Sequence, residues 1–138
     1  MPVPAPMQDH LPPSLADFER LAEAGWAGLP PEMRAACAGL AVRVEDFAPE
    51  AVLADLGMED PFELTGLYEG TALTLRSHAD QPEAPDIVWL FRRPILEEWI
   101  DRGDVDLGDL VRHVLVHEVA HHLGWSDEDI MAVDDWTA

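Results

Sequence analysis

The segment from Asp106 to Leu123 constrains the fold of this chain more than any other stretch of the sequence. It contains no proline, it opens with an aspartate that can cap a helix, and it carries a second acid, Asp109, in the first turn. Apolar residues then recur at helical spacing up to Gly124, a residue type that commonly follows the last turn of a helix. We therefore predict one helix of about 17 residues near the C-terminus.

This predicted helix has two unlike faces. With about 100° between successive residues, His113, His117 and His121 fall on one narrow stripe. The broad opposite arc is apolar and contains Val111, Leu115, Val116, Val119, Ala120 and Leu123. We expect the apolar arc to pack on the core and the histidine stripe to face a cleft. His122 projects into the apolar arc, so we expect it to be a core histidine that is hydrogen-bonded to a carbonyl.

The histidine stripe has the spacing of a metal site. His117 and His121 are four residues apart, so their imidazoles project from the same side of a helix and can hold one ion together. Glu118 lies about 100° further around the helix, where it can reach a water bound to the ion. The chain reversal after Gly124 can return the carboxylate of Asp127 to the ion, which gives two nitrogens, one oxygen and one open position.

This arrangement predicts zinc and hydrolytic chemistry. Zinc lowers the pKa of a bound water to about 7 and polarises a carbonyl. Glu118 is the expected general base and acid, which accepts a proton from that water and delivers it to the leaving nitrogen. The third ligand could instead be Glu128, Asp129 or a water. A further donor is needed for the developing oxyanion, and Tyr68, His113 or Arg92 could supply it.

The same residues carry a resemblance to a known family. Residues 117 to 127 read His-Glu-Val-Ala-His-His-Leu-Gly-Trp-Ser-Asp. They resemble the signature His-Glu-x-x-His-x-x-Gly-x-x-Asp of the small bacterial zincin-like metallopeptidases, also described as minimal zincins. Gly66–Gly70 and Ile87–Ile95 resemble loop and strand segments of that family, so the likeness covers about residues 15 to 135. The resemblance implies that the two histidines and Asp127 bind zinc, that Glu118 is catalytic, and that the substrate is a peptide or a protein.

The rest of the chain predicts an α+β fold, in which a small sheet of about three strands is backed by helices and the active-site helix is central. Helices are expected at 14–24, 30–40, 49–56 and 94–103, and strands at 41–47, 71–75 and 87–91. Either of the last two strands could present an edge to an extended substrate. The proline-rich residues 1–14 are expected to be a flexible tail, and residues 15–138 a single zincin-like domain.

Composition limits the partners that can be expected. The chain has 28 acidic residues against 8 lysines and arginines, a net charge of −20, so a phosphate backbone would be repelled and nucleic acid is not an expected partner. Basic or unfolded cationic segments would suit this charge better, although the same acidity could serve solubility alone. No run has the length of a signal peptide or a bilayer span, which predicts a cytoplasmic protein without membrane contact. The single cysteine, Cys37, is expected to be buried and structural.

Two other functions compete with hydrolysis. The short chain and its acidity would also suit a non-catalytic, zinc-stabilised interaction module with a degenerate or latent peptidase site. A weaker alternative is an acidic mimic of nucleic acid, which would bind no metal. Zinc content and peptide turnover separate the three functions.

Overall fold

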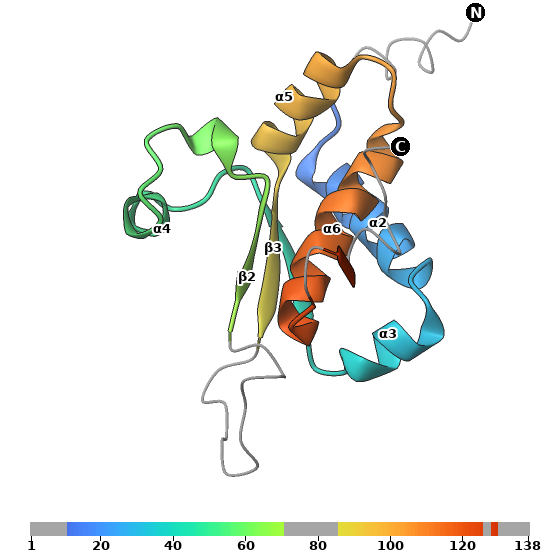
Figure 1. The fold of residues 1–138 in the computed structure, drawn as a ribbon. Coiled ribbons are helices and arrows are strands. Elements are labelled where there is room, and N and C mark those ends of the chain that lie inside the picture. The colour runs from blue at the N-terminus through green and yellow to red at the C-terminus, as the bar shows by residue number, and fades with distance from the viewer. Residues whose placement is uncertain (1–10, 71–85, 126–127, 130–138) are drawn as a thin grey trace, which may run out of the picture.

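The computed structural model describes residues 11–70, 86–125 and 128–129. Figure 1 shows its elements. The helices are α2 (Leu15–Ala27), α3 (Pro31–Ala36), α4 (Glu50–Asp55), α5 (Arg92–Arg102) and α6 (Leu107–Leu123), with a 3₁₀ turn η1 at Pro61–Glu63, and the strands are β1 (Ala41–Glu45), β2 (Gly66–Glu69) and β3 (Ile87–Phe91). This arrangement confirms the predicted α+β class with a small sheet.

The three strands form one mixed sheet in the order β1-β3-β2. Strand β1 is parallel to β3, with Ala41 opposite Ile87, and β2 is antiparallel to β3, with Leu67 opposite Trp89. Strand β3 is therefore paired on both sides. The expectation that 87–91 could offer an open edge to a substrate is wrong, and the other strand considered for that role, 71–75, lies outside the described residues.

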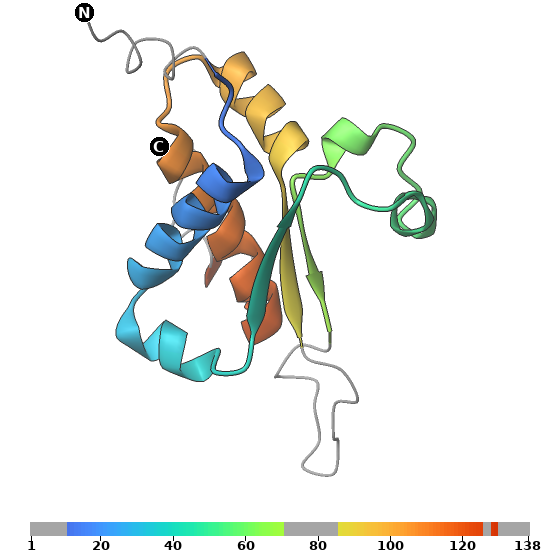
Figure 2. The same ribbon diagram turned by 180° about the vertical axis from the view of Figure 1, so that it is seen from behind.

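Helices α2 and α6 cover one face of the sheet, and α4 lies on the opposite side, as the two opposed views show (Figures 1 and 2). Alternation along β3 explains this layering, because successive side chains point to opposite faces. Val88 and Leu90 are fully buried in the core shared with α2 and α6. Phe91 belongs to a smaller cluster with Leu53 of α4, and Trp89 packs against that cluster.

Local sequence signals explain most helix ends. Ser14 and Asp17 form a reciprocal capping box at the start of α2, where a helix was predicted to begin. Helix α3 ends at Ala36, not near residue 40, because the chain turns there: the N–H of Leu40 donates to the carbonyl of Cys37 (3.0 Å), and Gly39 has a φ of 93°. Cys37 is buried, as predicted, and burial raises the pKa of its thiol.

Helix α5 begins at Arg92, two residues before the predicted start at Pro94. A proline is tolerated there because the first N–H groups of a helix have no partner within it. The guanidinium of Arg92 bonds the carboxylate of Asp46 (2.6 Å) and the carbonyl of Pro13 (2.9 Å). These bonds tie the chain before α2 to the sheet. Residues 1–10 of the predicted tail lie outside the described residues.

None of the described helices combines the length and the apolar character that crossing a bilayer requires.

Candidate metal centre

Helix α6 is a buried, regular scaffold. It runs for 17 residues with the Asp106 side chain accepting from the N–H of Asp109 at its start, which confirms the predicted cap and length. Its buried side chains are Leu107, Leu110, Val111, Val114, Leu115, Val116, Val119, Ala120 and His122. The histidines of the stripe are not among them. The predicted packing of the apolar arc on the core is therefore confirmed, with Leu123 half-buried at its end.

The end of α6 has the hydrogen bonds of a Schellman motif. The N–H of Gly124 donates to the carbonyl of His121 (3.1 Å), and the N–H of Trp125 donates to the carbonyl of Ala120 (2.9 Å). Gly124 has a φ of 75°, a left-handed conformation that glycine adopts easily, and it ends the helix where the sequence predicted. Trp125 packs on the core, so the direction in which the chain leaves α6 is fixed on both sides of the turn.

The three stripe histidines follow one another along α6. The rings of His113 and His117 meet edge to face, with centroids 4.8 Å apart and an interplanar angle of 71°. Both residues are half-buried, whereas the side chain of His121 is 51% exposed. Exposure therefore increases toward the C-terminal turn, where the metal-binding pair was predicted.

Glu118 lies beside this stripe in a mostly buried position. Its side chain is only 14% exposed, and its Oε1 lies 3.1 Å from Nδ1 of His121. Burial raises the pKa of Glu118, because desolvation penalises the carboxylate. His121, His117 and the Tyr68 backbone oppose that rise in pKa, since a positive charge or an N–H donor favours the ionised form. A buried carboxylate held among donors is suited to accept and return a proton.

Strand β2 approaches α6 closely at this point. A Cβ added to Gly66 would lie 2.7 Å from Cγ1 of Val114 and 3.2 Å from Cγ of Glu118. Only a glycine lets the strand backbone come this near to the helix. Because Gly66 and Tyr68 occupy non-hydrogen-bonded positions opposite β3, their backbone groups point to the outer edge of β2. The Tyr68 backbone bond to Glu118 follows from this geometry.

His122 is buried, as predicted, and two side chains contact its imidazole. Its Nδ1 lies 3.0 Å from the hydroxyl of Tyr68 and 3.6 Å from a carboxylate oxygen of Asp86. Two side chains, one from β2 and one from the residue just before β3, therefore meet this imidazole. Gly70 also lies against this cluster, because a Cβ added there would overlap Oδ1 of Asp86. This cluster joins the C-terminal turn of α6 to the sheet.

Two of the three residues that the sequence suggested as oxyanion donors have other hydrogen-bond partners in the structure. The Tyr68 hydroxyl is directed to His122, and the Arg92 guanidinium is bonded to Asp46 and Pro13. Arg92 is thus used to fix α5 against the sheet. His113 remains on the stripe, one turn before His117.

The donor set fits zinc as far as the structure describes it. Two imidazoles project one turn apart from an unbroken helix, and His121 meets Glu118 through Nδ1, so Nε2 is the nitrogen that would bind a metal. Within 11–70, 86–125 and 128–129 there is no group of three or more potential ligands in a metal-binding arrangement, so Glu128 and Asp129 do not complete one. Asp127, the predicted third ligand, lies outside the described residues.

Sequence reasoning named Tyr68 as a candidate but missed the close approach of β2 at Gly66 and the contribution of Asp86 to this site. The glycine of the Gly-Leu-Tyr-Glu segment was a visible signal, since a glycine inside a strand often marks a close backbone approach. Asp86 had no such local signal, because it becomes part of the site only when the sheet brings it to the end of α6.

The chain matches a known protein family over most of its length. The model of a zincin-like metallopeptidase family matches residues 37–136, which include the whole of the sheet and α6. The chain belongs to the zincin-like metallopeptidase family. The resemblance drawn from residues 117–127 is thus confirmed at the level of the family. A search of curated proteins returned no match.

Proposed function

We propose that the protein is a zinc-dependent peptidase in which Glu118 is the general base and acid. The observation that carries this proposal is the position of Glu118: a mostly buried carboxylate with a raised pKa, next to two histidines one turn apart on the same helix. Membership of the zincin-like metallopeptidase family supports the same reaction class.

His117, His121 and Asp127 are the residues that would hold the metal. When bound, zinc supplies a Lewis acid that polarises the scissile carbonyl and makes water more acidic. Two neutral imidazoles and one carboxylate are a ligand set that leaves a position open for a reactant. The Schellman turn at Gly124 supports the choice of Asp127, because it reverses the chain three residues before that carboxylate.

Glu118 is the proposed residue that transfers the proton between the water and the leaving nitrogen. Its carboxylate accepts a proton from the attacking water and delivers it to the nitrogen that leaves when the amide bond breaks. A raised pKa makes Glu118 a stronger base than an exposed glutamate, while the nearby imidazoles and the Tyr68 N–H keep the ionised form accessible. Burial also limits competition from bulk water for this proton.

The edge of β2 is the proposed place for the substrate backbone. It is the outer strand of the described sheet on the side of α6, and the backbone of Gly66 lies against Glu118. An extended peptide that pairs along this edge would place its own amide groups next to the proposed base. A peptide or protein segment in extended conformation is therefore the proposed substrate class.

The test compares wild type with Glu118→Gln on a mixture of peptides, with zinc measured in both proteins. We expect about one zinc per chain in each protein and a loss of turnover of at least about 10³-fold in Glu118→Gln, because the base is removed and the ligands are kept. Glu97→Gln is the matched control, since Glu97 is exposed on α5. Cleavage that survives Glu118→Gln would refute the role of Glu118.

A second comparison separates hydrolysis from a purely structural zinc site. His117→Ala and Asp127→Ala should lose both zinc and turnover. If wild type binds zinc and is stabilised by it but cleaves none of the peptides, the non-catalytic interaction module describes the protein better. If wild type binds no zinc, both functions are refuted together.

A further inference from the structure

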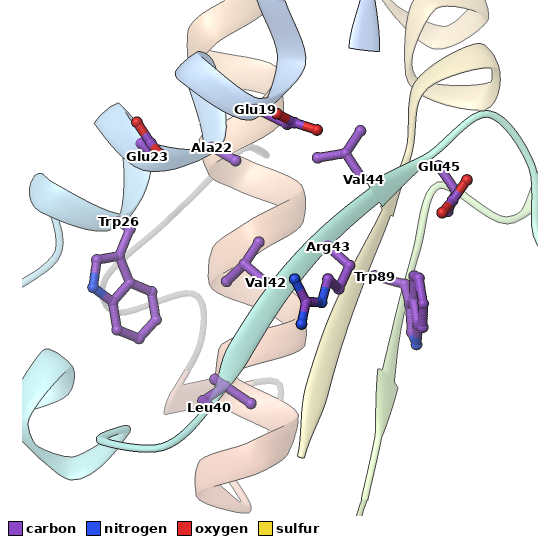
Figure 3. Close-up of a pocket in the computed structure, with 10 residues that line it drawn as sticks. All are labelled: Glu19, Ala22, Glu23, Trp26, Leu40, Val42, Arg43, Val44, Glu45 and Trp89. Atoms are coloured by element: carbon purple, nitrogen blue, oxygen red, sulfur yellow. The ribbon is translucent and has the colours of Figure 1, made fainter. Parts of the chain in front are cut away.

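A groove lies at the opposite edge of the sheet from Glu118. It has a volume of about 730 Å³ and runs between α2 and the outer edge of β1 (Figure 3). Its lining residues are Glu19, Ala22, Glu23 and Trp26 of α2, Leu40, Val42, Arg43, Val44 and Glu45 of β1 and its approach, and Trp89 of β3. Because β3 and β2 lie between it and the Gly66 edge, this groove is separate from the proposed active site.

The floor of the groove is a strand edge. The N–H of Ala41 donates to the carbonyl of Asp86 on the β3 side (3.0 Å), and the parallel register continues from Ala41 to Glu45. Since backbone groups alternate in direction along a strand, the N–H and C=O groups of Val42 and Val44 point away from β3. Within the described part of the sheet, no strand pairs with that side of β1.

The walls of the groove combine apolar and acidic side chains. Trp26, Leu40, Val42 and Val44 are half-buried and pack against the core from one side. Glu19, Glu23 and Glu45 are exposed around the groove, and Arg43 is the basic residue that lines it. Figure 3 shows the indole of Trp26 on the α2 side of the groove, facing the β1 edge. Among the described residues, these three carboxylates form no ion pair.

We propose that this groove binds an extended, basic segment of a partner polypeptide by β-strand addition to β1. The strand edge offers backbone donors and acceptors to any extended chain. The charges select the partner: three carboxylates against one arginine favour lysine and arginine side chains, and the net charge of −20 adds long-range attraction for a basic chain. Trp26 can additionally receive a cation on its ring face.

The same features disfavour other occupants. A nucleic acid would bring its phosphates against Glu19 and Glu23. A second copy of this chain would carry the same acidic surface to the groove. A basic polypeptide segment is the occupant that satisfies the strand edge, the apolar walls and the carboxylates together. The proposal does not depend on hydrolysis at Glu118.

The probe is a capped peptide of about eight residues that alternates lysine and valine, added to the full-length Glu118→Gln protein in the presence of a chelator. These conditions remove cleavage and metal binding from the measurement. We expect saturable binding, with amide chemical-shift changes centred on Val42 and Val44 and not on Gly66 and Tyr68. A peptide of the same length that alternates glutamate and valine should not bind. Shift changes centred on the Gly66 edge, or no binding of the lysine peptide, would overturn the proposal.

Two further comparisons test charge and strand addition separately. Glu19→Gln combined with Glu23→Gln should weaken binding about three- to tenfold, because two exposed ion pairs are lost. Glu59→Gln combined with Glu97→Gln removes the same charge elsewhere on exposed positions and should leave the affinity nearly unchanged. Equal weakening in both double variants would mean that the groove does not select the peptide, and would overturn the proposal.

The lysine-valine peptide N-methylated at its four central residues keeps its side chains and charge but cannot donate those backbone hydrogen bonds. We expect it to bind at least about tenfold more weakly. In the protein without peptide, the amides of Val42 and Val44 should exchange rapidly with solvent. Unchanged binding of the N-methylated peptide would overturn strand addition. Slow exchange of both amides would show that another segment or a second copy already occupies the edge, and would overturn the proposal as well.

Discussion

At the scale of single residues, Glu118 links the stability of the metal-free protein to pH. Its pKa is raised mainly by burial, so the folded protein binds this proton more tightly than the unfolded chain does. The stability contributed by the protonated carboxyl is complete below the unfolded pKa of 4.5 and is lost as the pH rises through the higher folded value. At neutral pH the buried carboxylate therefore costs free energy.

The upward shift of the Glu118 pKa predicts how Glu118→Gln changes stability in the presence of a chelator. The variant should melt at a higher temperature than wild type at pH 7, because the amide has no charge to desolvate. The difference should shrink as the pH falls through the folded pKa and then below 4.5, where the wild-type carboxyl becomes protonated in both states. Melting temperatures from pH 4 to 8 check this, with Glu97→Gln as the exposed control. A constant difference across the range would contradict the linkage.

The Tyr68 hydroxyl provides a second test at this scale. Because it is bonded to the buried His122 (3.0 Å), we expect Tyr68→Phe to lower the free energy of unfolding by about 1 kcal/mol. The backbone N–H that meets Glu118 is kept in this variant, so kcat should change little. If the hydroxyl instead stabilised the oxyanion, kcat would fall about 10²-fold or more. Chemical denaturation and peptide turnover, measured on the same preparation, distinguish the two roles.

The residues of the site differ in how far sequence could predict them. His117, Glu118 and His121 belong to one helix, and a helix fixes their relative directions from spacing alone. Their environment depends on tertiary structure. Tyr68 and His122 are 54 positions apart, and the packing of β2 against α6 brings the hydroxyl to the imidazole. A helical wheel could place His122 in the core, but it could not name its partner.

At the scale of elements, the two glycines that end α5 and α6 form a natural pair for experiment. Gly103 and Gly124 have φ values of 79° and 75°, and each follows a helix. An alanine at either position is forced into the left-handed region, so we expect each substitution to cost roughly 1–2 kcal/mol of stability. Nothing lies within 4 Å of a Cβ added at Gly103, so that substitution has no steric term.

The two substitutions should differ in their effect on zinc affinity. The turn at Gly124 directs the chain toward Asp127, so Gly124→Ala should weaken zinc binding about tenfold or more. Gly103→Ala should leave zinc affinity unchanged, because its turn leads from α5 into α6. Competition titration with a zinc chelator dye, alongside urea unfolding, measures both effects. Equal zinc affinity in the two variants would contradict the proposal that the Gly124 turn positions Asp127 as a zinc ligand.

Element boundaries show the same division between local and tertiary causes. The ends of α6 and the whole of β3 were predictable, since a capping aspartate, a C-terminal glycine and a short run of apolar residues fix them locally. Strand β2 was not predicted as a strand, because Gly66 has a low β propensity. Its glycine is required by the approach to Val114 and Glu118, a contact that no local pattern contains.

At the scale of the whole molecule, the net charge of −20 is a source of self-repulsion in the folded state. Basic residues are too few to balance it, and the ion pair between Arg102 and Glu98 joins neighbouring turns of one exposed helix face, where such pairs stabilise little. Added salt shortens the distance over which like charges interact, from about 30 Å at 0.01 M to about 8 Å at 0.15 M. The folded state, in which the charges are closer together, gains more from this screening than the unfolded chain.

We therefore expect the melting temperature at pH 7 to rise as sodium chloride increases from 0.01 to 0.15 M, by an amount equivalent to about 1–2 kcal/mol. The control is the same salt series near the isoelectric point of about 4.2, where positive and negative charges balance. There the salt effect should be small or reversed, because attraction between opposite charges is screened as well. Replacing sodium by potassium should give the same curve at pH 7, since screening depends on ionic strength and not on the identity of the cation. A rise of equal size at both pH values would show that salt acts through surface exclusion, and that self-repulsion does not limit the stability of this fold.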